Sequence, residues 1–344
     1  MRRFLCLLSL CWGLSYCLSP KNEKLDAEWE AWKTTYGKNY SEKEESFRRQ
    51  VWEKNLKLIN DHNRLFKEGK KSYFMGMNQF GDMTDKEFES RLNLRIAPVR
   101  TRRNYTFKRR IYYRLPKSVD WRTHGYVTPI RNQGECGACW AFSTIGSLEG
   151  QLFRKTGRLV ELSKQMLIDC SGYYTCMGGS LTGALDFIRR YGVVSERCYP
   201  YMNGQNWWCY RRQCPFVRIR DYVTLPSGDE RALMQAVATV GPVAVAIHAP
   251  PSFRYYQGGP YIEPRCRLSY MSNMNHALLV VGYGPLERSK YEEFGLQAYM
   301  HKDNKFWIAK NSWGEQWGDR GYIYIPKDRY NQCGIASNAN YPIL

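Results

Sequence analysis

The stretch Cys136-Gly137-Ala138-Cys139-Trp140 opens a predicted helix. Apolar residues follow at helical spacing, and Arg154, Lys155 and Gly157 are typical of a helix C-terminus. Because Cys139 lies near the helix N-terminus, the helix dipole and free N–H groups there favour its thiolate. The thiolate is the nucleophilic form of cysteine, so the sequence marks Cys139 as a candidate nucleophile.

The same motif has two other interpretations, a structural disulfide partner and a redox pair. A helix-opening CxxC is also the thioredoxin pattern, but no βαβ pattern surrounds Cys136 and Cys139. A zinc site is less favoured, because Cys170 and Cys176 have the wrong spacing for a second CxxC. The local motif alone leaves these alternatives open.

The first residues and the cysteines indicate the compartment. Arg2 and Arg3 precede an apolar stretch over 4–18, which is too short to span a bilayer and has the order of a cleaved secretory signal. No later apolar run has transmembrane length, and the best one, over 277–281, fits only a buried strand.

Nine of the twelve cysteines follow residue 135. An odd number in an oxidising compartment leaves at least one thiol free.

Composition divides the chain at a basic stretch. Residues 19–92 are free of cysteine and helical in pattern, and residues 95–114 carry eight basic side chains and no acidic one, as an exposed, protease-accessible linker does. Sequons at Asn39 and Asn104 fit a secreted, glycosylated leader.

The positive charge belongs largely to that leader and linker. The whole chain has 51 basic and 32 acidic side chains, but from Leu115 onward there are 26 and 18, so nucleic-acid binding loses its support. A local basic cluster remains, which is either a solvated face or a site for an acidic glycosaminoglycan. Its members are Arg211, Arg212, Arg218 and Arg220.

The leader carries two further patterns. One stripe at helical spacing mixes charged, aromatic and amide side chains on one face, which an ordinary core helix does not need. Its members are Glu45, Arg49, Trp52, Asn55, Ile59 and Asn63. A short, strand-like alternation follows, with Gly76, Asn78, Phe80 and Asp82 at every second position. By pattern alone, the leader is a small helical domain.

Together these motifs resemble those of papain-family cysteine proteases of the cathepsin L/K/S kind, and the resemblance covers nearly the whole chain. The stretch 136–140 resembles the nucleophile segment, both leader patterns resemble the propeptide motifs, and 115–121 resembles the mature N-terminus. Asn275-His276-Ala277 resembles the base segment, and Asn311-Ser312-Trp313-Gly314 the segment of the third catalytic residue. Asn311 lies farther from Cys139 than is usual, and the excess falls in the polar stretch 285–304, interpreted as an enlarged surface loop.

The resemblance implies an α+β, papain-like fold of two lobes. A mainly helical lobe is expected around the helix after Cys139, and a β-barrel-like lobe is expected to carry His276 and Asn311. An N-terminal helical propeptide precedes them. The expected division is a signal peptide over 1–18, an inhibitory propeptide over 19–114 and a mature protease over 115–344.

The implied activity is that of a lysosomal or secreted cysteine endopeptidase made as an autoinhibited zymogen. Cys139 is the expected nucleophile and His276 its partner in a thiolate–imidazolium pair. Asn311 is expected to orient the imidazole, with Trp313 shielding that hydrogen bond from water. The Gln133 side chain and the Cys139 N–H are expected to form the oxyanion hole.

The resemblance also implies a substrate pocket that prefers an apolar residue at the second position before the cleavage site. Its residues are Gly178, Gly179, Ser180, Leu181, Ala246, Asn275, Ala277, Trp313 and Asn338. Asn338 departs from the family pattern, since an amide replaces the more usual apolar side chain.

The remaining expectations concern cysteine pairing and partners. The resemblance pairs Cys136 with Cys176, Cys170 with Cys209 and Cys266 with Cys333, and leaves Cys198 and Cys214 for a fourth bridge. No cofactor or metal is expected. The expected partners of a monomer are polypeptide substrates, its own propeptide and cystatin-type inhibitors. The non-enzyme alternative is an inactive homologue that acts as a binding or inhibitory protein.

Overall fold

The computed structural model describes residues 23–96, 107, 114–172, 174–206, 208–210, 213–266, 273–296 and 305–344. The predicted signal peptide, the sequon at Asn104 and two arginines of the basic cluster, Arg211 and Arg212, lie outside these residues. The chain forms two compact units, Met1–Arg49 and Gln50–Leu344. Within the described residues, no helix combines the length and the apolar character needed to cross a bilayer.

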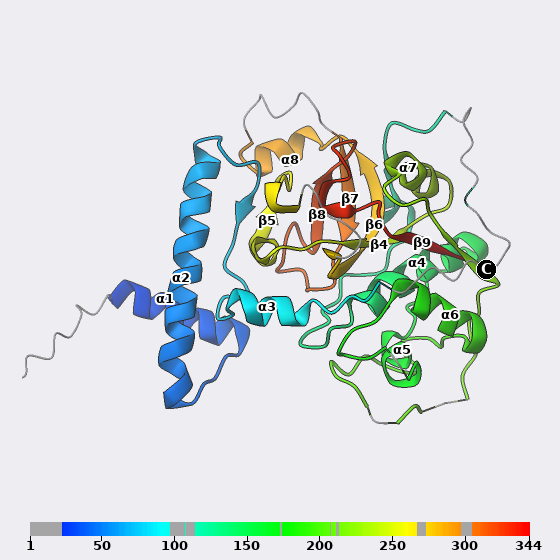
Figure 1. The fold of residues 1–344 in the computed structure, drawn as a ribbon, viewed down its shortest axis with the longest axis horizontal. Coiled ribbons are helices and arrows are strands. Elements are labelled where there is room, and N and C mark those ends of the chain that lie inside the picture. The colour runs from blue at the N-terminus through cyan, green and yellow to red at the C-terminus, as the bar shows by residue number, and fades with distance from the viewer. Residues whose placement is uncertain are drawn as a thin grey trace, which may run out of the picture. The chain divides into compact units, whose positions relative to one another are not determined.

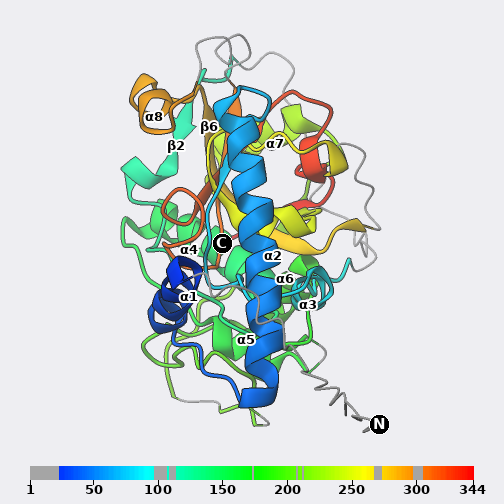
Figure 2. The ribbon, with the colours of Figure 1, turned by 90° about the vertical axis from the view of Figure 1, so that its left-hand side faces the viewer.

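The first unit contains α1 (Glu23–Tyr36) and the beginning of α2 (Glu42–Lys67), which is one continuous helix (Figure 2). The indole N–H of Trp29 donates to Glu45 Oε1 at 2.8 Å, and the Arg49 guanidinium lies 5.7 Å from the centre of the Trp29 ring. Charged residues on the leader stripe therefore join α2 to α1. The helix predicted from the leader stripe is confirmed as part of α2.

The second unit combines helices with a seven-stranded antiparallel sheet (Figure 1). Besides the rest of α2, its helices are α3 (Asp85–Arg91), α4 (Cys139–Thr156), α5 (Lys164–Cys170), α6 (Leu181–Tyr191), α7 (Glu230–Thr239) and α8 (Arg288–Glu293). Its 3-10 turns are η1 (Trp121–His124), η2 (Pro251–Tyr255), η3 (Pro264–Cys266) and η6 (Gln332–Gly334).

The sheet has the strand order β3-β9-β4-β6-β7-β8, and β2 also pairs with β6. Its strands are β2 (Val119–Asp120), β3 (Asp221–Thr224), β4 (Val243–Ile247), β6 (His276–Gly284), β7 (Phe306–Lys310), β8 (Tyr322–Pro326) and β9 (Ala339–Ile343). A separate two-stranded sheet joins β1 (Phe74–Met75) to β5 (Tyr256–Gly258). Every residue of β6 is buried, so the buried strand predicted over 277–281 is confirmed.

Helix α4 lies against the sheet and begins the helical lobe, with α5 and α6 beside it (Figure 1). It ends before Gly157, which has φ 69° and supplies the left-handed residue of the C-cap. Ser143 Oγ donates to the Leu278 carbonyl at 2.6 Å, and Ser147 Oγ donates to the Pro242 carbonyl at 2.8 Å. These buried hydrogen bonds fix the N-terminal half of α4 beside β6 and the residue that precedes β4.

Two local expectations differ from the structure. The alternation over 76–82 forms no strand, because the Asn78 side chain accepts from the Phe80 N–H at 3.1 Å and its carbonyl accepts from the Gly81 N–H at 3.0 Å, which closes a turn. The stretch 285–304 is not simply a polar surface loop, since it contains α8 and buries Tyr291 and Phe294. Residues 297–304 of this stretch lie outside the described residues.

Four disulfides bridge the second unit, and they are the four pairs expected from the sequence. They are Cys136–Cys176, Cys170–Cys209, Cys198–Cys214 and Cys266–Cys333. Among the described residues, the cysteine left free is Cys139. The redox interpretation needs a Cys136–Cys139 pair, and the bond from Cys136 to Cys176 argues against it.

Candidate active site

Cys139 is the first residue of α4 and is buried at the point where this helix meets β6. The backbone of Ala277, the second residue of β6, forms a hydrogen bond with the Cys139 sulfur. Helix N-termini stabilise a negative charge through free N–H groups and the helix dipole. The two elements therefore bring the thiol to the backbone of Ala277, the residue after His276, at a helix end that favours its ionisation once it is exposed to solvent.

His276 forms a buried hydrogen bond with the side chain of Asn311, in which Nε2 lies 2.8 Å from Oδ1. An amide oxygen only accepts, so Nε2 carries the proton and Nδ1 is the basic nitrogen. Nδ1 is buried and has no hydrogen-bond partner in the structure. Asn311 Oδ1 also accepts from the Ser312 N–H at 2.8 Å, which holds the amide in this orientation.

Trp313 covers the imidazole. Its ring stacks on His276 with centroids 4.6 Å apart and an interplanar angle of 30°, and 4% of the residue is exposed. An indole face excludes water from the histidine–asparagine hydrogen bond, which strengthens that bond in a low local dielectric. This is the shielding arrangement expected from the sequence.

Gln133 is buried and is held by four hydrogen bonds, one of which is donated by the Tyr201 hydroxyl to its carbonyl at 2.7 Å. Its backbone N–H donates to the Ser312 carbonyl at 2.7 Å, and its Oε1 accepts from Ser312 Oγ at 2.6 Å. Its Nε2 donates one proton to the Cys136 carbonyl at 2.9 Å. The amide is thus fixed near the start of α4, with the second N–H of Nε2 available to a ligand.

In the full-length chain, burial favours the uncharged state of both the Cys139 thiol and the His276 imidazole. It raises the pKa of the Cys139 thiol to about 12, although hydrogen bonds from the backbone of Ala277 and Trp140 act in the opposite direction. It lowers the pKa of His276 to about 4, against the hydrogen bond with Asn311. At neutral pH the covered site therefore holds a thiol and a neutral imidazole rather than an ion pair.

The segment Asn93–Arg95 of the leader covers the site. The Leu94 N–H donates to the Asn275 carbonyl at 3.2 Å, the Arg95 N–H donates to the Gly179 carbonyl at 2.8 Å, and Leu94 pairs with Gly179 in parallel. Gly178 has φ 112°, and a Cβ there would collide with the Asn93 carbonyl. The glycines expected to bind substrate backbone therefore bind the backbone of the leader.

The Leu94 side chain is 8% exposed and belongs to a large cluster of buried apolar side chains. Leu94, Leu181, Ala246 and Ala277 belong to one cluster of buried apolar side chains, which also contains Cys139 and Met274. The sequence did not single out Met274 or Leu94. Met274 directly precedes the base segment in the sequence, and this position could have indicated that it lies near the site.

The polar residues of the expected pocket mainly bond to the protein itself. Asn275 exchanges two hydrogen bonds with Ala249, at 2.8 and 3.1 Å. Asn338 Oδ1 accepts from Asn340 Nδ2 at 2.6 Å. Ser180 caps α6 by accepting from the Gly183 N–H. Their side chains thus shape the pocket through the backbone they hold.

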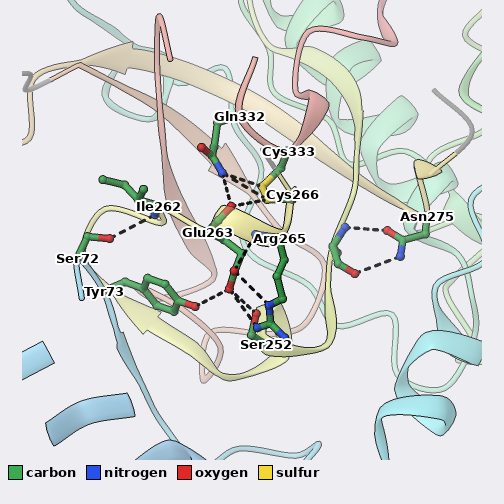
Figure 3. The surroundings of a disulfide bond; sticks show 11 residues. Ser72, Tyr73, Ser252, Ile262, Glu263, Arg265, Cys266, Asn275, Gln332 and Cys333 are labelled. Carbon is green, nitrogen blue, oxygen red and sulfur yellow. Dashed lines mark hydrogen bonds and ion pairs between the residues drawn. A yellow bond between two sulfur atoms is a disulfide. The ribbon is translucent and has the colours of Figure 1, made fainter. Parts of the chain in front are cut away.

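A second anchor of the leader lies beside the Cys266–Cys333 disulfide (Figure 3). The Tyr73 hydroxyl donates to Glu263 Oε2 at 3.1 Å, and this carboxylate also accepts from Ser252 at 2.9 Å and from Arg265 at 3.2 Å. The leader is therefore held at Glu263 as well as along the covered site.

In the part of the chain that the structure describes, no three His, Cys, Asp or Glu side chains are grouped so as to hold a metal ion. The chemistry of the site is that of a cysteine, a histidine and two amides.

Comparison with protein families decides between the interpretations of this site. The family model described as papain family cysteine protease matches residues 115–343. The chain belongs to the papain family. A second model, the cathepsin propeptide inhibitor domain, matches residues 29–88 of this papain-family protease, so the chain is a zymogen that carries its own inhibitor domain.

Relatives and solved structures of similar length agree with this assignment. Human cathepsin L2 is 42% identical to this papain-family chain over 99% of both chains, and mouse cathepsin J is 45% identical over 98% of this chain and 97% of its own. The structure of digestive procathepsin L 3 from Tenebrio molitor larval midgut has a TM-score of 0.81 at 38% identity, and the match covers 93% of this chain and 99% of that one. The papain-like fold with a helical propeptide is confirmed.

Proposed function

We propose that this zymogen becomes a cysteine endopeptidase in which Cys139 and His276 perform the chemistry. The observation that carries the proposal is the free, buried Cys139 at the N-terminus of α4, together with a buried histidine whose Nε2 is bound by Asn311. A cysteine, a base and a third group that orients the base form the arrangement that activates a thiol.

The reaction begins when the leader leaves and water reaches the site. The Cys139 proton moves to His276 Nδ1, and the thiolate attacks the scissile carbonyl carbon. The second N–H of Gln133 Nε2 and the Cys139 backbone N–H donate to the developing oxyanion. His276 then protonates the leaving amine as its C–N bond breaks, which leaves a thioester on Cys139.

The second half of the reaction restores the enzyme. A water molecule gives a proton to His276 Nδ1 and attacks the thioester carbonyl, and the C–S bond breaks to release the carboxylic acid and the thiolate. Asn311 keeps the imidazole in one orientation through both halves, because its Oδ1 accepts from Nε2 throughout.

The substrate class follows from the pocket that Leu94 fills. The buried apolar cluster to which Leu94 belongs also includes Leu181, Ala246, Met274 and Ala277. An apolar pocket discriminates by the apolar area that a ligand buries. We therefore propose a preference for an apolar residue at the second position before the cleavage site, as the sequence predicts.

The four disulfides support a route through an oxidising secretory compartment, to the lysosome or the extracellular space. Asn39 is exposed, as a glycosylated asparagine must be. The processed form is proposed to begin near Leu115, after the basic linker.

The test is to acidify purified wild-type proenzyme and its Cys139→Ala variant in parallel. Chain length and hydrolysis of a peptide with Leu at the second position before the cleavage site are followed together. We expect only the wild type to shorten to a form that begins near Leu115 and then to cleave the peptide. Arg158→Gln, at an exposed arginine, serves as a control that leaves the nucleophile and base in place.

The proposal fails if the wild type remains inert after another protease has removed the leader. In that case the chain acts as a binding or inhibitory protein. Processing of Cys139→Ala at the wild-type rate without added enzyme would also contradict it, since the shortening would then not depend on this thiol.

A further inference from the structure

Arg254, in η2 of the protease part, is almost completely buried, with 1% of its side chain exposed. Its guanidinium carbon lies 5.2 Å from the centre of the Phe88 ring and 4.6 Å from the centre of the Tyr255 ring. A buried guanidinium is stable only when an anion or several acceptors compensate for the loss of water. The groups around the Arg254 guanidinium must therefore supply these acceptors.

Most of the partners of Arg254 belong to the leader. One terminal nitrogen, Nη2, donates to Asp85 Oδ1 at 2.7 Å and to the Met83 carbonyl at 3.3 Å. The other, Nη1, donates to the Pro251 carbonyl at 3.2 Å, within the protease part. The Nε atom is buried and has no hydrogen-bond partner.

Removal of the leader therefore takes away the carboxylate, one carbonyl and the Phe88 ring together. Among the described residues, no ion pair joins Arg254 to an acidic side chain of the protease part. What remains is a guanidinium with several free N–H groups, supported by the face of Tyr255. This fork of donors matches the two oxygens of a carboxylate.

A chain of aromatic rings connects Arg254 with the catalytic histidine. Phe88, which packs on Arg254, meets the Trp313 ring edge-on with centroids 5.6 Å apart, and Trp313 stacks on His276. His276 delivers its proton to the leaving amine in the proposed mechanism, so this is the leaving-group side of the site. The opposite end of the covering segment, at Leu94, lies on Gly179.

We propose that Arg254 forms a carboxylate-binding subsite of the processed protease, which takes an Asp or Glu side chain in the leaving-group part of a peptide substrate. The inference rests on the proposed endopeptidase function. Asp85 of the zymogen occupies the subsite in the place of that residue. Departure of the leader both uncovers the catalytic cysteine and converts an internal ion pair into a determinant of specificity.

The test uses wild-type enzyme processed from the full chain and peptide pairs that differ only by Glu or Gln. The substituted position is moved through the first four residues after the cleavage site. We expect kcat/KM to favour Glu over Gln by about five- to tenfold at one position, as a partly exposed, charge-assisted contact allows. The preference should fall as salt is added.

The Arg254→Gln variant should lose the preference, so that its kcat/KM values for the Glu and Gln peptides become equal. Arg254→Lys keeps the charge without the fork and should retain part of the preference, which provides a second variant if the first does not fold. Arg158→Gln, at an exposed arginine, is the matched control and should behave like the wild type.

The inference is overturned if processed wild-type enzyme cleaves the Gln peptides and shows no preference for Glu at any position. It is also overturned if the preference persists in Arg254→Gln. Failure of the proposed function has a different signature, in which no peptide of either kind is cleaved. The processed Cys139→Ala chain, cut by another protease, then tests the subsite through its affinity for the same peptide pairs.

Discussion

The Nε2 atom of His276 lies 2.8 Å from Oδ1 of Asn311, and the Trp313 ring covers both side chains. This relationship settles which ring nitrogen carries the proton, and therefore which one can receive the proton of Cys139. The two residues come from different strand ends, since His276 begins β6 and Asn311 follows β7. Pairing of β6 with β7 brings them together.

Replacing Asn311 with Ala should lower kcat by about 10–100-fold and change KM little, because the imidazole loses the acceptor that orients it and that supports its basicity. The measurement is steady-state hydrolysis of a peptide by processed enzyme, with kcat followed across pH. Gln316→Ala removes an exposed amide from the same region and is the matched control. Full activity in Asn311→Ala would show that Trp313 packing alone positions the ring.

Replacing Gln133 with Ala should lower kcat by about 10²–10³, the usual cost of losing one oxyanion-hole donor. The effect should appear in kcat rather than KM, because the oxyanion exists in the transition state and not in the bound substrate. Ser312→Ala removes only the hydroxyl that holds Gln133 Oε1 at 2.6 Å and should cost less. If Ser312→Ala proves as harmful as Gln133→Ala, the amide acts mainly in holding the loop.

Replacing Leu94 with Ala should loosen the covering segment and allow peptide hydrolysis by unprocessed chain at neutral pH. Truncating a buried leucine costs about 2–3 kcal/mol, which corresponds to a roughly 30–150-fold increase in the uncovered fraction. Activity is measured on full-length protein under conditions in which its chain length does not change. Leu58→Ala is the control, since Leu58 is 43% exposed. Unchanged latency in Leu94→Ala would mean that the Glu263 anchor alone keeps the segment in place.

The sequence predicts those parts of the site whose signals are local. The spacing after Cys139 predicts α4, and the apolar run from Ala277 predicts the interior of β6, because both patterns report which face of an element is buried. The interrupted polar pattern over 285–304 conceals α8, because Tyr291 in the helix and Phe294 just after it are too few buried side chains to form a stripe.

Contacts between residues that lie far apart in the sequence leave no such local pattern. Nothing near Arg254 or Leu94 in the sequence indicates that one meets Asp85 and the other pairs with Gly179. Both contacts depend on how the leader lies on the protease part, and tertiary packing sets that arrangement. For the contact of Arg254 with Asp85, the sequence offers one weak indication, which is the position of a single arginine in an otherwise apolar segment.

The last prediction concerns His62 of α2, which is buried against the segment leading to the site. Its Nε2 lies 2.9 Å from the Tyr73 carbonyl, its ring lies 4.5 Å from the Tyr73 ring, and the Tyr73 hydroxyl donates to Glu263 (Figure 3). Burial lowers the pKa of His62 below its ordinary value of 6.5. Nearby Lys71 and Arg265 act in the same direction, whereas the Tyr73 hydrogen bond and Glu263 oppose it.

The sign of the pH effect follows from this shift. A histidine with a lowered pKa in the closed form takes up a proton when the leader opens, so the closed form loses stability as pH falls below about 6.5. His62→Gln cannot take up that proton, and its processing midpoint should move to lower pH with a less steep transition. The rate of chain shortening against pH measures this, with the exposed His124→Gln as control. An unchanged midpoint in His62→Gln would assign acid activation to other groups, such as His276, whose pKa is also lowered by burial.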